Sequence, residues 1–430
     1  MKKTLIAVTA LLAGVVADAA LPHVSDVSFA RRSRGRVTIR YTLDIDAVVT
    51  FDVKTNGVSI GGVHLSGATG DVFREVSAGA GRTITWNALE QWPDGLVTDR
   101  SMHVEVLAWA LSDKPDIMVV DLNAPKQSCV RYYPSVDFLP GGLFGNDAYR
   151  TSSIVMKRVH AANWTWTMGG ADGGTEAKEA GHSVTLTNDY YMALFETTQS
   201  CWTNVYGAFS GTVAPTFAVD GDMRPMETAV TYYRLRENTD NKTANSDYQY
   251  PNPPCPDSFL GKLRDRTGVD FDLPSEAQWE FAARSGAPHK HYNNWVALKA
   301  VTGGIDAPGR CTTTGATASD TGELGPDEGG TARVGSYAPS RWGFYDFHGN
   351  VAELCLDWYA VDILSLNGAV NANGPYLADG VTTGSVRSHH GSAWNVSGGN
   401  NLRISLRNSA SPKSGYNTLG FRLCCRNGLE

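Results

Sequence analysis

After its first twenty residues the chain of 430 residues has no long apolar run, and it has little concentrated positive charge. A helix that crosses a membrane needs about 20 apolar residues, so no transmembrane segment is expected. The only dense basic cluster is short, from Arg31 to Arg34, and the formal net charge is −7. A nucleic-acid partner requires a basic surface, so nucleic acid is not expected as a ligand.

Signatures of common metal and redox chemistry are also missing. The chain contains no C-x-x-C pair, which argues against a zinc or thioredoxin-type site. It has no H-E-x-x-H segment, P-loop or dinucleotide-binding fingerprint either. The seven cysteines are an odd number, so at least one is unpaired, and the pattern of any disulfides stays open.

The first nineteen residues differ from the rest in composition. Lys2 and Lys3 precede an apolar run from Leu5 to Val16, and the small residues Ala17 and Ala19 follow. This order is typical of a secretory signal peptide over residues 1–19. We therefore expect an exported protein, secreted or periplasmic.

Residues 20–112 alternate between apolar and polar side chains, and turn residues separate the runs. Period-two alternation with turns rich in Gly and Asn predicts an all-β sandwich of the immunoglobulin or fibronectin kind. The expected structural role is a spacer or docking unit. The apolar positions that carry this prediction are Val37, Ile39, Tyr41, Leu43, Val49, Phe51, Val53, Met102, Val104 and Val106.

Proline and glycine dominate residues 113–150, which are expected to form a linker with one short strand from Ile117 to Leu122. The following domain, residues 151–427, is rich in Gly, Trp and Tyr and shows two helical patterns. One helix is expected to begin near Thr197. Another is expected after Ser275, whose spacing to Gln278 is that of a capping box.

Ordered blocks in this second part resemble the sulfatase-modifying-factor family, which includes the formylglycine-generating enzyme. The strongest are D-L-P-S-E-A-Q-W-E-F-A-A-R (272–284), G-F-Y-D-F-H-G-N-V-A-E-L (343–354) and L-G-F-R (419–422). The resemblance implies an α+β, C-type-lectin-like fold with much irregular structure, placed after the sandwich. It also places a structural calcium site on Asp346, Gly349, Val351 and Glu353, because calcium prefers carboxylate and carbonyl oxygens. The alternative is a buried carboxylate pair bound to turn amides.

Copper is not expected. Family members that oxidise a sulfatase cysteine to formylglycine hold copper(I) with two cysteines, and thiolates select this soft ion. The resemblance places Asn395 at the first of these positions and Asn400, or Gly399, at the second. Iron chemistry is not expected either, since no H-x-x-x-H-x-E pattern occurs. His389 and His390 are adjacent, so on a strand they point to opposite faces and do not readily chelate one ion.

The resemblance places the ligand surface of this fold on the segment from Ala393 to Asn417, whose Asn, Ser and Trp content suits adaptable binding. Two of its arginines are interpreted either as a cationic rim or as ion-paired parts of the scaffold. We expect a non-catalytic protein that binds a peptide, glycan or protein ligand. The alternative is a formylglycine-generating oxidoreductase that acts on sulfatase cysteines, and the sequence leaves enzymatic activity open. The candidate ligand-binding residues are Ser392, Trp394, Asn395, Asn400, Arg403 and Arg407.

Overall fold

A computed structural model describes most of the chain after the first twenty residues. The described residues are 21–32, 35–93, 102–170, 177–211, 213–218, 221–237, 245–286, 309–311, 330–364, 367–370, 384–396 and 399–426. The predicted signal peptide, residues 1–19, lies outside them. No helix within these ranges is long and apolar enough to cross a membrane.

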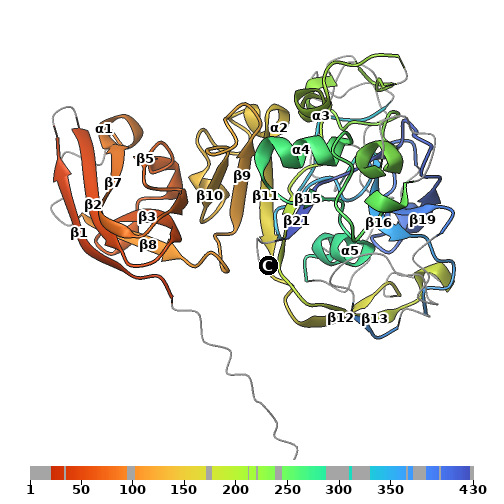
Figure 1. Ribbon diagram of the computed structural model, residues 1–430, viewed down its shortest axis with the longest axis horizontal. Helices are drawn as coiled ribbons and strands as arrows, with labels where there is room; N and C mark the ends of the chain where they lie inside the picture. Colours follow the sequence, from red (N-terminus) through yellow and green to blue (C-terminus); the bar gives the residue numbers. More distant parts are fainter. Residues whose placement is uncertain are drawn as a thin grey trace, which may run out of the picture.

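The N-terminal unit consists of two antiparallel sheets packed face to face (Figure 1). One sheet has the strand order β1-β2-β7-β5, and the other is built on β3, which pairs with β4, β6 and β8. The strands are β1 (Val24–Arg31), β2 (Arg36–Leu43), β3 (Ala47–Thr55), β4 (Val58–Ser59), β5 (Thr69–Gly70), β6 (Arg74–Val76), β7 (Gly79–Asn87) and β8 (His103–Trp109).

The alternation of apolar and polar residues along the strands produces this sandwich. Every second residue of β2, from Val37 to Leu43, is buried, as the period-two pattern predicts. The rings of Phe51 and Trp86 meet between the sheets with their centroids 6.4 Å apart. A short helix, α1 (Ala88–Gln91), follows β7.

The segment predicted as a linker is instead part of the second unit. It contributes β9 (Ile117–Asp121) and β10 (Val130–Tyr133) to a six-stranded sheet with the order β10-β9-β11-β14-β21-β15. The apolar run from Ile117 onward pairs antiparallel with β11 (Ser153–Val159), so its backbone groups are satisfied inside a sheet. The remaining strands are β14 (Tyr190–Ala193), β15 (Phe271–Asp272) and β21 (Cys424–Arg426).

Four α-helices of the described residues lie around this sheet (Figure 1). They are α2 (Ala148–Thr151), α3 (Gln199–Tyr206), α4 (Phe259–Thr267) and α5 (Glu276–Arg284). Thr198 caps α3, close to the predicted start. Ser275 and Gln278 form the predicted capping box of α5, in which each side chain bonds the other residue's backbone N–H.

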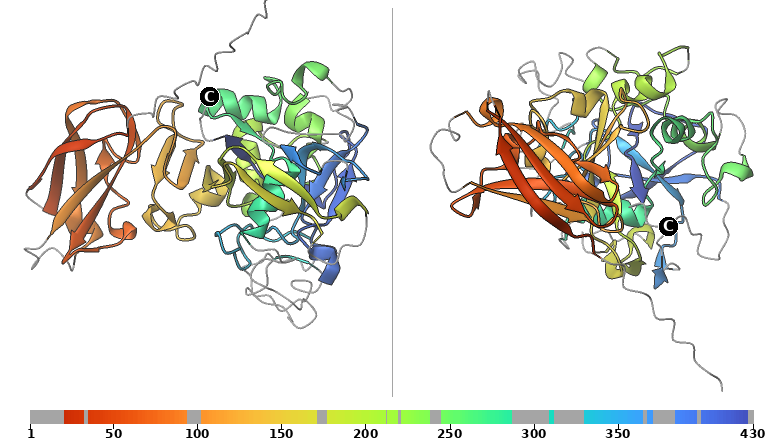
Figure 2. Two further views of the ribbon diagram at one scale, coloured as in Figure 1. Left: turned by 90° about the horizontal axis from the view of Figure 1, so that it is seen from below. Right: turned by 60° about the vertical axis from the view of Figure 1, so that its left-hand side comes forward.

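Two smaller sheets complete the second unit. The first has the order β12-β13-β17, and the second has the order β19-β18-β16-β20. Both lie away from the sandwich (Figure 2). Their strands are β12 (Trp164–Met168), β13 (His182–Leu186), β17 (Ala369–Val370), β16 (Ala352–Trp358), β18 (Arg387–His390), β19 (Arg407–Ala410) and β20 (Leu419–Gly420).

The sandwich packs directly on the second unit through aromatic side chains. The ring of Phe73 lies 4.8 Å from that of Tyr133 and 6.3 Å from that of Phe138, measured between centroids. The backbone N–H of Tyr132 donates to the carbonyl of Phe73 at 2.9 Å. The chain therefore forms an α+β fold in which a β-sandwich and a C-type-lectin-like unit share a contact. Cys129, Cys201, Cys255, Cys355 and Cys425 are free thiols.

Candidate functional site

The predicted ligand-binding segment begins where β18 ends. Ser392, two residues beyond β18, has a φ of +81°, a strained value for a residue with a side chain. Its buried Oγ has no hydrogen-bond partner among the described residues. The preceding Gly391 accepts a hydrogen bond from the N–H of Gly349 at 3.3 Å. The start of this segment is thus held against the block predicted to bind calcium.

Trp394 anchors the segment in two directions. Its indole N–H donates to the carbonyl of Asn417 at 2.9 Å, and its backbone N–H donates to the carbonyl of Asn350 at 2.9 Å. Its ring packs edge-on against Phe217, with centroids 5.2 Å apart. Trp394 is therefore mainly a brace that holds the two ends of the segment together, and only part of it faces solvent.

The exposed side chains that the structure describes on this surface are amides, a serine, one lysine (Lys413) and one aromatic ring. Asn395 is exposed directly beside Trp394, and Tyr416 is 51% exposed beside Asn417. Tyr416 and Phe217 were not among the predicted site residues. An isolated Tyr in a loop gives no sequence signal, but the bond from Trp394 to Asn417 fixes the residue next to Tyr416 in the structure. The side chain of Asn400 lies outside the described residues.

Arg403 and Arg407 are ion-paired parts of the scaffold, one of the two interpretations left open by the sequence. Arg403 binds Glu179 through two nitrogens, at 2.6 and 2.5 Å. Arg407 binds Glu276 in the same way, at 2.8 and 2.5 Å. All four residues are buried. The arginine side chains therefore do not form a cationic rim on the ligand surface.

The block predicted to bind calcium contains a buried ion pair. Glu353 accepts two hydrogen bonds from Arg422, each 2.6 Å long, and a third from the indole N–H of Trp279 at 2.6 Å. Val351 donates its N–H to Glu196 at 3.1 Å. The structure thus brings three carboxylates, those of Glu196, Asp346 and Glu353, near the single guanidinium of Arg422.

This cluster carries more carboxylates than cations, and the pKa values reflect the imbalance. Burial raises the pKa of Glu196 well above its usual value, and the nearby charge of Asp346 adds to the rise. Burial likewise raises the pKa of Asp346 to about 6. One oxygen of Asp346 accepts from the N–H of Gly335 at 2.7 Å, while the other is buried with no partner among the described residues.

The structure suits some of the four predicted calcium ligands better than others. The unpartnered oxygen of Asp346 suits a cation, because a buried oxygen without a donor is costly and a bound ion offsets that cost. Glu353 fits less well, since its oxygens already accept from Arg422 and Trp279. Within the described part of the chain, no group of three His, Cys, Asp or Glu residues is arranged to hold a metal ion.

A second buried charged group surrounds Glu276. His390 contacts this carboxylate through Nε2 at 3.0 Å and stacks on Trp279. Burial raises the pKa of Glu276, but Arg407 and His390 outweigh burial and leave the pKa lowered. Asp357 accepts from the N–H of Glu276 at 2.8 Å, and burial raises its pKa to about 7. This group is interior scaffold.

The second unit has a C-type-lectin-like α+β architecture. Trp394 and the buried ion pairs of Arg403 and Arg407 fix its surface segment. The sulfatase-modifying factor enzyme 1-like domain family matches residues 125–427 of this chain. The chain belongs to this family.

Individual relatives match shorter regions. The formylglycine-generating enzyme of Thermomonospora curvata is 34% identical over 154 residues, which cover 35% of this chain and 48% of that protein. The serine/threonine-protein kinase pkn1 of Chlamydia pneumoniae is 32% identical over 155 residues, 36% of this chain and 21% of that protein. The structure of PvdO from Pseudomonas aeruginosa aligns with a TM-score of 0.46 and 19% identity, over 64% of this chain and 94% of that one. The chain spans about half the length of the formylglycine-generating enzymes of bacteria that it matches.

Proposed function

We propose that this chain is an exported, non-catalytic member of the family that binds a peptide, glycan or protein ligand. The proposed binding surface is the segment from Ala393 to Asn417. The observation that carries the proposal is the exposed amide of Asn395, held in place beside the brace Trp394. The resemblance puts a copper-binding cysteine of the oxidase at this position. An amide is a hard, neutral donor and does not replace a thiolate for copper(I).

Several features of this surface favour binding. Trp394 links the two ends of the Ala393–Asn417 segment, and the ion pairs of Arg403 and Arg407 fix its base. Ligand binding therefore costs little conformational entropy. Exposed Asn side chains supply adaptable hydrogen bonds, and Tyr416 supplies an aromatic contact. The net charge of −7 makes nucleic acid an improbable target of such a surface.

The second candidate function is that of a formylglycine-generating oxidoreductase acting on sulfatase cysteines. It is favoured by the 34% identity with the Thermomonospora curvata enzyme. It requires metal ligands other than Asn395 and Asn400.

We also propose a structural calcium ion, bound through the unpartnered oxygen of Asp346, as part of the scaffold.

A binding screen on the full chain tests the first proposal. Immobilised glycans and a displayed peptide library are probed with the wild type, and each ligand found is measured again with Asn395→Ala and Tyr416→Ala. Asn188→Ala, an exposed asparagine in the turn between β13 and β14, is the matched control. Binding that falls in the first two variants and not in the control supports the proposal. Equal binding by all variants contradicts the assignment of this surface.

A further inference from the structure

The β1-β2-β7-β5 sheet of the sandwich has an outer face that is turned away from the second unit. The other sheet of the sandwich, built on β3, is the one that contacts β10 of the second unit (Figure 1). Along β2, every second side chain from Val37 to Leu43 points into the sandwich, and those between point outward. Two of the outward residues, Arg36 and Arg40, are exposed, and they follow directly on the basic cluster Arg31–Arg34.

Three arginines lie on this face at positions that the strand register fixes. The N–H of Arg32, one residue beyond β1, donates to the carbonyl of Arg36 at 2.6 Å, so these two residues lie opposite each other across the β1–β2 hairpin. Opposite side chains of an antiparallel pair share one face, with their Cβ atoms about 5 Å apart. Arg40 lies four positions further along β2, which is about 14 Å at about 3.4 Å per residue. The three side chains therefore form a positively charged row.

None of these three arginines has a carboxylate partner among the residues that the structure describes. Carboxylates at the border of the face bind other groups. Asp71 pairs with Arg74 at 2.7 Å. Glu90 accepts a hydrogen bond from the side chain of Asn87, and Asp26 accepts one from the neighbouring serine. The charge of the arginine row is therefore not neutralised by these groups.

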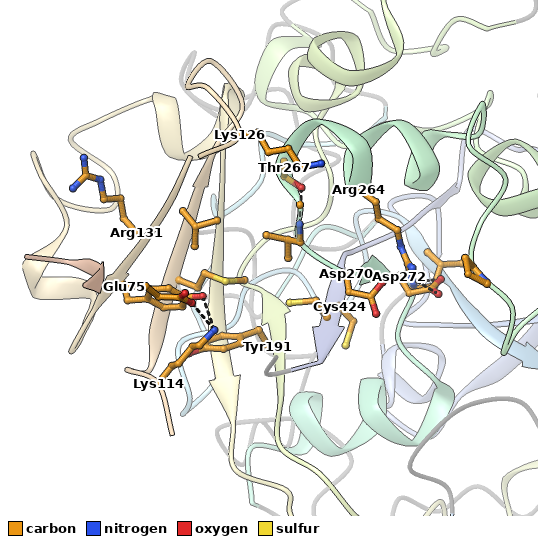
Figure 3. A pocket seen from close by; sticks show the side chains of 18 of the residues that line it. Glu75, Lys114, Lys126, Arg131, Tyr191, Arg264, Thr267, Asp270, Asp272 and Cys424 are labelled. Atoms are coloured by element: carbon orange, nitrogen blue, oxygen red, sulfur yellow. Dashed lines mark hydrogen bonds and ion pairs between the residues drawn. The ribbon is translucent and has the colours of Figure 1, made fainter. Parts of the chain in front are cut away.

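The cavity between the two units shows the contrast. There, Arg264 pairs with Asp270 and with Asp272 (Figure 3). Lys114, whose side chain is only 12% exposed, pairs with Glu75 of the sandwich at 2.9 Å. The protein itself neutralises these charges, whereas the outer face of the sandwich keeps its arginines exposed to solvent.

The opposition of Arg32 and Arg36 costs stability when no anion is present, because like charges directly opposite each other in a sheet repel. An acidic group between the two side chains removes this repulsion and adds charge-assisted hydrogen bonds. All three positions hold arginine and none holds lysine. A planar guanidinium group binds a carboxylate through two parallel N–H donors, which an ammonium group does not.

Small hydroxyl side chains cover the face between and beside the arginines. Thr38 lies opposite Thr85, which in turn lies opposite Thr69. Thr83 lies opposite Arg40. Hydroxyl groups both donate and accept hydrogen bonds, which suits the hydroxyl groups of a sugar. The outward residues that the structure describes on these strands include no aromatic ring, and surfaces for single-stranded nucleic acid stack bases on such rings.

We infer that this face binds an acidic polysaccharide whose sugar units carry carboxylate groups. One carboxylate lies between Arg32 and Arg36, a second lies at Arg40, and sugar hydroxyl groups contact Thr38. A small anion reaches only one end of a row about 14 Å long, whereas an extended polymer spans it. The inference does not depend on the proposed function of the Ala393–Asn417 surface, and it gives the sandwich a role beyond that of a spacer.

Calorimetric titration of the full chain with polygalacturonate, and with its methyl-esterified form as the uncharged control, tests the inference in buffer without added calcium. We expect the acid to bind and the ester to bind much more weakly. In the double variant Arg36→Gln/Arg40→Gln the Kd should rise roughly tenfold, because two exposed charges are lost. Lys126→Gln/Arg131→Gln removes two positive charges from the β9–β10 hairpin and should leave the Kd unchanged. Asn395→Ala should also leave it unchanged, which separates this face from the proposed binding surface.

Several results would overturn the inference. An ester that binds as tightly as the acid removes the role of the carboxylates. An unchanged Kd in Arg36→Gln/Arg40→Gln, or an equal loss in the hairpin variant, removes the role of the arginine row. A single-stranded oligonucleotide that binds more tightly than polygalacturonate assigns the face to nucleic acid, and no binding of the acid at low salt removes the site. Thermal unfolding of each variant, expected to match the wild type because the substituted side chains lie at the surface, shows that a loss concerns binding and not folding.

Discussion

Arg422 and Glu353 form a bidentate ion pair in which both side chains are completely buried. The pair joins two sequence blocks that lie 69 positions apart, and it connects the segment just before β21 to the start of β16. Arg422 also donates to the carbonyl of Tyr345 at 2.8 Å, and its guanidinium lies 3.9 Å from the ring centre of Phe347. A single arginine thus holds the centre of the family domain together.

Removing this arginine should destabilise the protein strongly. Arg422→Met leaves Glu353 buried without its cation, which costs about 3–5 kcal/mol of unfolding free energy. Urea unfolding measures the loss. The double variant Arg422→Met/Glu353→Leu should lose much less than the single variant, since it leaves no uncompensated charge. A double variant as unstable as Arg422→Met would show that packing, and not charge, dominates here.

Arg403 should matter for stability and not for ligand contact. Its guanidinium is bonded to Glu179, so Arg403→Gln should lower the unfolding free energy by about 3 kcal/mol. Asn395→Ala, at an exposed position, should change stability by less than about 0.5 kcal/mol. Thermal unfolding of both variants checks the contrast. Equal melting temperatures would mean that the ion pair does not support this surface.

Stability should fall as the pH rises from about 4 to about 7. The pKa of Asp346 is about 6 and that of Asp357 is about 7 in the folded protein, both above the ordinary value of 3.8 because the groups are buried. The folded state therefore holds more protons than the unfolded state in this range. Each proton contributes a slope of about −1.4 kcal/mol per pH unit. Denaturant unfolding at several pH values measures it, and Asp346→Asn should make the slope shallower below pH 6.

Calcium should reduce the same pH dependence. If the ion binds the unpartnered oxygen of Asp346, it replaces the proton there and raises the melting temperature at neutral pH. A chelator should reverse the shift, and Asp346→Asn should abolish it. A shift of equal size in Asp346→Asn would place the ion elsewhere.

Local signals in the sequence predict the local structure well. The alternation in β2 and the capping box at Ser275 appear in the structure as predicted. The helix α4 escaped prediction although Ser258 caps its start and Gly268 ends it in a left-handed conformation, because only a few apolar residues follow the cap.

Features set by distant contacts are harder to predict. The strand from Ile117 was expected in a linker, whereas it pairs with the nearby β10 and also with β11, which begins more than thirty residues later and joins it to the second unit. The partners of Arg403 and Arg407 lie 224 and 131 positions away. An arginine in an Asn-rich loop therefore looks like a surface residue until the fold brings its carboxylate near.

The central claim is that the family's fold is kept here while the copper chemistry is not. Titration of the purified chain with copper(I), alongside the double variant Asn395→Cys/Asn400→Cys, tests it most directly. We predict no tight copper binding by the wild type and one tightly bound copper per chain in the variant. One equivalent of tightly bound copper in the wild type, together with conversion of the cysteine in a sulfatase peptide to formylglycine, would contradict the claim.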